Sequence, residues 1–144
     1  RKTFYRLFES RQDVLDSLID RTLREYIRFS LPPHLAVPGV SPDLLSFYYY
    51  WFEQRDLLNV LSKNGISTML YDRSIRHVMQ EETDILQQIG VVPSLQGSEE
   101  AMMFFLSGIL TLVVGWHHTG YQKSPVQMAV ITEKLLSEPP VRFV

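Results

Sequence analysis

A segment at the start of the chain is rich in basic and hydroxyl side chains, the types that bind phosphate. Lys2, Thr3, Tyr5 and Arg6 lie close together in the sequence. The phenylalanines of the same segment are four positions apart, so they can share one buried helix face and leave the polar side chains outside. Basic and hydroxyl groups on one exposed surface suit the phosphate backbone of nucleic acid. On composition alone, the solvated end of an ordinary helix explains the same residues and is the simpler interpretation.

A run of aromatic residues at positions 47–52 is the second candidate for chemistry. Consecutive helix positions point in every direction, so some of these rings must be partly exposed or line a cavity. Aromatic rings combined with methionines can form an adaptable pocket for a hydrophobic or planar small molecule. For any single member, core packing is the alternative role. The predicted pocket consists of Tyr48, Trp51, Phe52, Met69, Tyr71, Phe104 and Phe105.

The histidines and clustered acids do not indicate catalysis or metal binding. His117 and His118 are adjacent, so on a helix they diverge by about 100° and cannot chelate one ion together. Near a helix end they are expected to interact with terminal carbonyls or with the helix dipole. The acids at 81–84 have no spaced histidine or Gly-rich loop beside them and are expected to form a solvated face. The chain has no cysteine. We expect no enzyme, no metal and no cofactor.

Helix start and stop signals divide the chain, whereas alternating strand patterns with hairpin turns are absent. Ser10, Ser41 and Ser124 are expected N-caps, and the last two precede a proline at the first helical position. Prolines and glycines after each apolar segment end the helices. The fold class predicted is all-α. The expected helices lie near 10–29, 55–62, 67–88, 98–120 and 124–137, and one more starts at 42 and carries apolar residues through 52.

Length and composition favour one globular domain with an uneven charge. The chain has 144 residues, of which 45% are hydrophobic and 21% charged. The net charge is -2, but residues 1–11 hold four basic residues and one acid, and the remainder holds 10 basic and 15 acidic residues. A whole-chain polycation is therefore excluded. Because the sequence starts without Met or a signal segment, we expect a fragment that lacks its beginning.

Two separated segments resemble the TetR family of transcriptional regulators. The letters TFYRLF at 3–8 and SRQDVL at 10–15 resemble the signature T-F-Y-x-x-F-x-[ST/N/D]-K-x-x-L-[IL], which ends the helix-turn-helix of that family. Residues 104–108 and 115–125 resemble the F-x-x-G…W-x-x-x-G-x-x-x-S-P segment of the regulatory domain, in a branch common among Gram-positive bacteria. Residues 50–58 resemble the family's helix junction more loosely. The two closer matches occur in the family's order.

The resemblance implies a division into two parts. Residues 1–9 would be the remnant of a DNA-binding helix-turn-helix, and residues 10–144 the helical effector-binding and dimerisation domain. Leu7 departs from the family, which often has histidine there, so no phosphate contact is implied at that position. The implied protein is a cytoplasmic regulator. The apolar stretch at 101–116 is too short and too interrupted for a membrane span, and no membrane partner is expected.

The resemblance also implies the residues that contact operator DNA in the full-length protein. Arg1 and Lys2 match recognition-helix positions that face the major groove, and Thr3 and Tyr5 match positions whose hydroxyls meet phosphates. Arg11 matches the family's lysine at the start of the next helix, where a cation and backbone amides hold a phosphate together. Because the bracing helix is missing, the chain alone is expected to bind DNA weakly or not at all.

The resemblance also implies a homodimer, in which the last two helices pack against the same helices of a second copy as a four-helix bundle. The sequence supports it independently, because the helix at 98–120 is apolar on nearly all sides, more than one core face requires. Gly108 and Gly115 are seven positions apart and permit close helix approach. The alternative is a central helix buried within a monomer. The predicted interface comprises Phe105, Ile109, Leu112, Val113, Trp116, Met128, Ile131 and Leu135.

Together these features predict a transcriptional regulator whose operator affinity responds to an unidentified hydrophobic or aromatic effector. The helix at 10–29 would couple body to head as one rod, and a polar residue at Leu18 should uncouple them. The alternative is a TetR-like co-activator or a small all-α enzyme that acts without direct DNA binding.

Overall fold

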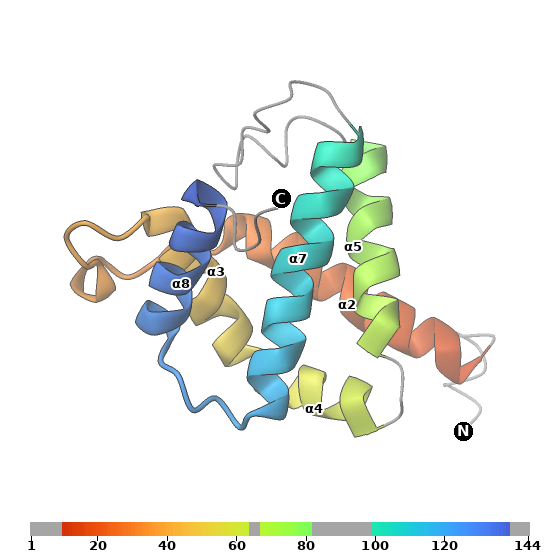
Figure 1. Cartoon of the computed structure of the whole chain (residues 1–144). Helices are drawn as coiled ribbons and strands as arrows, with labels where there is room; N and C mark the ends of the chain where they lie inside the picture. Colours follow the sequence, from red (N-terminus) through yellow and green to blue (C-terminus); the bar gives the residue numbers. More distant parts are fainter. Residues whose placement is uncertain (1–9, 64–66, 82–98, 139–144) are drawn as a thin grey trace.

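A computed structural model describes residues 10–63, 67–81 and 99–138 (Figure 1). Over these ranges the chain is helical and has no strand, which confirms the predicted all-α class. The DNA-contact positions Arg1, Lys2, Thr3 and Tyr5 lie outside the described residues, as does 82–88, the end of one predicted helix. The elements are α2 Arg11–Arg28, the 3₁₀ turn η1 Pro33–Leu35, α3 Pro42–Glu53, α4 Arg55–Lys63, α5 Ser67–Glu81, α7 Glu99–His118 and α8 Pro125–Ser137.

Side-chain caps fix the starts of three helices, as the sequence predicts. The Ser10 hydroxyl accepts from the backbone N–H of Asp13 at 3.2 Å, while the Asp13 carboxylate accepts from the backbone N–H of Ser10 at 3.1 Å. Ser124 and Gln127 form the same reciprocal box at 3.1 and 2.8 Å. The Ser41 hydroxyl caps α3. Each cap satisfies backbone donors that have no partner inside the helix.

A left-handed turn at the end of α7 sets the direction of α8. Gly120 has φ 68° and Tyr121 has φ 59°, a conformation that costs little for glycine and more for a residue with a side chain. Tyr121 is held there because its ring packs on Trp116 with centroids 4.9 Å apart and its backbone N–H donates to the Trp116 carbonyl at 3.1 Å. The Trp116 indole also donates to the Lys123 carbonyl at 2.8 Å. These contacts turn the chain away from α7.

The core forms where α3 meets the other helices. α3 packs against α8, and α7 packs against α5 and α4 (Figure 1). Leu45, Tyr48 and Trp51 of α3 are each at most 1% exposed, as is Val113 of α7. Removing side chains of this size from water stabilises the fold by about 1.5–3 kcal/mol for each aliphatic residue. Three aromatic residues of the 47–52 run, 48, 50 and 51, are buried and the other three half-buried, as helix geometry requires.

α2 crosses behind this core and packs on α5 (Figure 1). Its apolar stripe is mostly half-buried, and Ile19, at 0% exposure, is its one fully enclosed hydrophobic residue. Thr22 is also buried, and its carbonyl accepts from the Tyr50 hydroxyl of α3. Leu18, which the sequence singled out, is only half-buried. α2 is therefore attached to the body through a narrow line of contacts.

Candidate functional site

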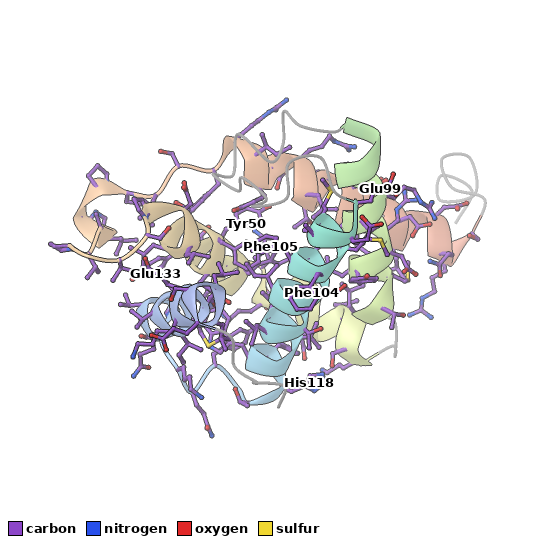
Figure 2. All side chains as sticks on the ribbon, turned by 45° about the horizontal axis from the view of Figure 1, so that its top comes forward. Tyr50, Glu99, Phe104, Phe105, His118 and Glu133 are labelled. Atoms are coloured by element: carbon purple, nitrogen blue, oxygen red, sulfur yellow. The ribbon has the colours of Figure 1, made fainter. Side chains whose placement is uncertain are left out.

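The residues predicted to line an effector pocket are divided between the core and the surface. Tyr48 and Trp51 lie in the core at 0% and 1% exposure. Phe104 is 86% exposed on the outer side of α7, so its assignment to an enclosed pocket is wrong. Figure 2 shows Phe105 on the side of α7 that faces Tyr50 and Phe104 turned away from it. The remaining members, Phe52, Met69, Tyr71 and Phe105, are half-buried against the core.

A small apolar depression lies elsewhere, between α4, α5 and α7. The space inside it is about 10 Å³, at most the room that one water molecule needs. Small-molecule sites typically have about 300–1,000 Å³. None of the predicted pocket residues lines it. The lining residues are Leu58, Leu61, Leu70, Val114 and His117.

Trp51 and Ser74 each place an unsatisfied polar atom in the described core. The Trp51 indole N–H and the Ser74 hydroxyl are buried and have no hydrogen-bond partner. Leaving a buried donor unpaired costs about 1–3 kcal/mol. Phe47 and Tyr50 pack on the Trp51 ring, with centroids 6.3 and 5.8 Å away. Trp51 therefore stabilises the core through its buried ring, while its indole N–H stays without a hydrogen bond.

Two tyrosine hydroxyls join helices that are far apart in the sequence. The Thr132 hydroxyl donates to the Met128 carbonyl at 2.8 Å, so at 2.5 Å it accepts from Tyr48. In the same way, the Ser107 hydroxyl donates to the Met103 carbonyl and accepts from Tyr71 at 2.7 Å. Burial raises the pKa of Tyr48, and the hydrogen bond with Thr132 opposes the rise. These bonds connect α3 to α8 and α5 to α7.

An ionic cluster that the sequence analysis did not identify joins α2 to α5. Asp20 of α2 accepts from Arg73 of α5 at both carboxylate oxygens, Oδ1 from Nε at 3.1 Å and Oδ2 from Nη2 at 2.5 Å. His77 Nε2 lies 3.0 Å from the same Oδ1 and, because a carboxylate only accepts, donates to it. Asp16 Oδ1 lies 4.0 Å from Arg73 Nε. Asp16 and Asp20, four positions apart on α2, thus face an arginine and a histidine that are four positions apart on α5. Both spacings are visible in the sequence.

The Asp20 carboxylate is held in its charged form by these partners. Burial raises its pKa, but the hydrogen bonds from Arg73 and His77 outweigh burial and leave the pKa below its ordinary value. The Arg73 pKa is raised, chiefly by its hydrogen bond with Asp20. The side chains of Asp20, Arg73 and His77 are 20%, 22% and 19% exposed. The cluster is therefore partly desolvated, where ion pairs are stronger than on an open surface.

One face of α7 is not covered by any other described residue. Phe104, Gly108, Thr111 and Gly115 follow a helical spacing of four, three and four, and all are exposed. A Cβ added at Gly108 or Gly115 would meet no atom within 4 Å. Beside this face Met103 is 44% exposed. The result is an apolar surface with flat, small-residue positions, which another helix can approach closely.

Half of the predicted dimer residues belong to the core of one chain. Ile109, Val113, Trp116 and Met128 are 0–5% exposed within it. They have no surface left for a partner, so the predicted interface is corrected at these positions. Phe105, Leu112 and Ile131 are half-buried and Leu135 is 38% exposed. The apolar pattern of α7 could not show which of its sides the chain's own helices cover.

The predicted histidines and Arg11 lie at the ends of their helices. His117 Nδ1 lies 2.8 Å from the Tyr121 hydroxyl, and burial lowers the pKa of His117. His118 and Arg11 are exposed. No group of three metal-ligand side chains occurs among the described residues. Within those residues, α7 is the one helix that is long and apolar enough to cross a membrane, and 28% of its most apolar stretch is buried. Core helices of soluble proteins can have the same length and composition.

Comparisons of the chain with protein-family models, with curated proteins and with solved structures give no match. The geometry described above and the resemblance of the two segments therefore carry the functional interpretation.

Proposed function

We propose that this chain is the ligand-sensing and dimerising part of a TetR-type transcriptional regulator. The observation that carries the proposal is the uncovered face of α7, with Phe104 86% exposed and no atom near a Cβ at Gly108 or Gly115. An apolar face of this kind is stable in water when a second surface covers it. The proposed partner is a second copy. α8, the other helix that the resemblance implicates, also carries exposed apolar side chains, with Leu135 38% and Leu136 59% exposed.

The position of α2 supports the coupling role. α2 starts at a fully formed capping box, directly after the residues that resemble the recognition helix, and continues unbroken from Arg11 to Arg28. In the proposed mechanism, an effector shifts the body, and α2 changes the spacing of the two DNA-binding heads relative to successive major grooves.

The proposed effector is hydrophobic or aromatic. Support comes from the contact between α5 and α7, where the half-buried Tyr71 and Phe105 are aromatic. The hydrogen bond between Tyr71 and Ser107 supplies a polar group at the same place. Entry of an effector there requires side chains to move, since the described depression lies elsewhere.

Leucine substitutions at Gly108 and Gly115 test the dimer. Because a Cβ at either position meets no atom within 4 Å and leucine favours helix, the fold should be retained while a partner helix is held off. We expect a two-chain mass for the unaltered protein and a one-chain mass for both variants in sedimentation equilibrium. The matched control is Asn59→Leu, which adds the same side chain at an exposed position of α4. A one-chain mass for the unaltered protein would refute the dimer.

Selection from random duplex DNA by the protein in its natural full length tests the regulatory role. We expect one enriched pseudo-palindrome, as a two-fold dimer requires. Replacing Arg1 or Lys2 by alanine should weaken binding to the selected site. Enrichment of no sequence would favour the co-activator or enzyme alternative.

A further inference from the structure

The cluster between α2 and α5 has the geometry of an anion site whose occupant belongs to the same molecule. Arg73 presents Nε and Nη2 to the two oxygens of Asp20, and His77 Nε2 adds a third donor at 3.0 Å. A planar guanidinium that binds both oxygens of a carboxylate recognises that group by shape as well as by charge. Both donors lie on one face of α5, because residues four apart on a helix are neighbours.

The exposure of the cluster makes exchange of its occupant feasible. Asp20, Arg73 and His77 each keep about one fifth of their side-chain surface in solvent. Breaking a fully buried pair leaves an uncompensated charge in the interior. Here the Asp20 carboxylate can turn toward water while another anion keeps Arg73 paired.

The charges around the site are divided between the two helices. The described acids that face it, Asp20 and Asp16, both belong to α2, and the guanidinium and imidazole donors belong to α5. Asp16 is more distant, 4.0 Å from Arg73, and accepts from Gln12 Nε2 at 3.3 Å. Loss of the Asp20 contact would therefore remove the main ionic link between the helices without removing the donor set on α5.

We propose that Arg73 and His77 form a carboxylate-binding site on α5, that Asp20 occupies it in this structure, and that a small molecule bearing a carboxylate competes with Asp20 for it. Binding of such a molecule replaces the ionic link between α2 and α5 with a link between α5 and the ligand, and it weakens the docking of α2 on the body. The consequence for DNA binding rests on the proposed function, because there α2 joins the body to the head. The site itself does not depend on that function.

Chemical rescue of Asp20→Ala tests the site, with acetate as the probe and chloride of equal ionic strength and pH as the reference. The variant empties the site, so acetate should stabilise it. We expect acetate to raise its melting temperature by about 4 °C at about ten times the acetate dissociation constant. The rise should be smaller in the unaltered protein, where Asp20 competes, and absent in Asp20→Ala/Arg73→Gln. The matched control is Asp56→Ala, an exposed acid on α4.

Two further variants keep the outcome decisive. Asp16→Asn/Asp20→Ala prevents Asp16 from replacing the lost carboxylate, and Asp20→Ser, which is also too short to fill the site, serves if the alanine variant does not fold. Equal acetate effects in all proteins, or an effect that survives Arg73→Gln, would overturn the proposal. Acetate rescue without any change in operator affinity of the full-length protein would support the site and contradict the proposed function alone.

Discussion

At the scale of single residues, tyrosine hydroxyl groups form hydrogen bonds that link pairs of helices. Tyr48, Tyr50 and Tyr71 each bring a ring into the protein interior and donate to an acceptor on another helix. A buried hydroxyl without a partner destabilises the fold by more than a formed hydrogen bond stabilises it. The direction of each bond therefore predicts which of its two partners matters more.

The pair between Tyr48 and Thr132 allows a sharp test of this asymmetry. Thr132→Val leaves the Tyr48 hydroxyl as an unpaired donor in the core, so we expect a loss of about 1–3 kcal/mol in the free energy of unfolding. Tyr48→Phe leaves Thr132 still donating to Met128 and should cost less, about 0.5–1.5 kcal/mol. Urea titration measures both, with Tyr49→Phe, a half-buried neighbour, as control. A larger loss for Tyr48→Phe would reverse the assigned direction of the bond.

At the scale of helices, α2 docks on the body through a few buried contacts. Its fully enclosed hydrophobic contact is Ile19, and its ionic attachment is Asp20. Neighbouring positions on one helix thus supply the apolar and the charged parts of its docking on the body. Substitutions along α2 should therefore differ strongly from one position to the next.

Alanine substitutions at Ile19 and Leu18 measure that difference. Ile19→Ala removes a side chain with 0% exposure, so we expect a loss of about 2–5 kcal/mol from lost burial and the remaining cavity. Leu18→Ala should cost less, because half-buried side chains already contact water. Thermal unfolding by circular dichroism checks both, with the exposed Ser17→Ala as the reference. Equal losses at 18 and 19 would mean that α2 docks in a different rotation.

At the scale of the whole molecule, four tyrosines make the fold sensitive to alkali. Burial raises the pKa of Tyr26, Tyr48 and Tyr50, and raises that of Tyr121 to about 12. In the unfolded chain a tyrosine loses its proton near pH 10. Above that pH the unfolded state binds fewer protons than the folded state, so stability is fully present below about pH 10 and falls as pH rises toward the folded values.

The expected result is a free energy of unfolding that is flat from neutral pH to about pH 9 and then decreases, by up to about 1.4 kcal/mol per pH unit for each fully shifted tyrosine. Tyr121 is partly exposed, so its share is smaller. Urea titrations at stepped pH measure the curve, and Tyr48→Phe should make it shallower. Stability unchanged up to pH 12 would contradict the shifts.

How much of this molecule could be predicted from sequence depends on the kind of information needed. The caps at Ser10 and Ser124 and the glycine at 120 are local signals, and the helices begin and end close to where they indicate. Which side of α7 faces the core is not local, since Phe104 and Phe105 are adjacent and chemically identical, yet one is exposed and the other half-buried. Likewise, Asp20 and Arg73 meet only because α2 crosses α5, a fact that helix periodicity does not contain.

The pairing of α3 with α8 has a consequence for the order of folding. Tyr48 and Thr132 lie 84 positions apart, so the inner surface of α3 finds its partner only after almost the whole chain is available. Closing so long a loop costs entropy before any contact is gained. During synthesis from the N-terminus, the side of α3 that carries Tyr48 therefore waits uncovered until α8 has emerged, whereas Tyr50 has its partner on α2. This interval, rather than the finished domain, is when its aromatic run is most exposed to aggregation.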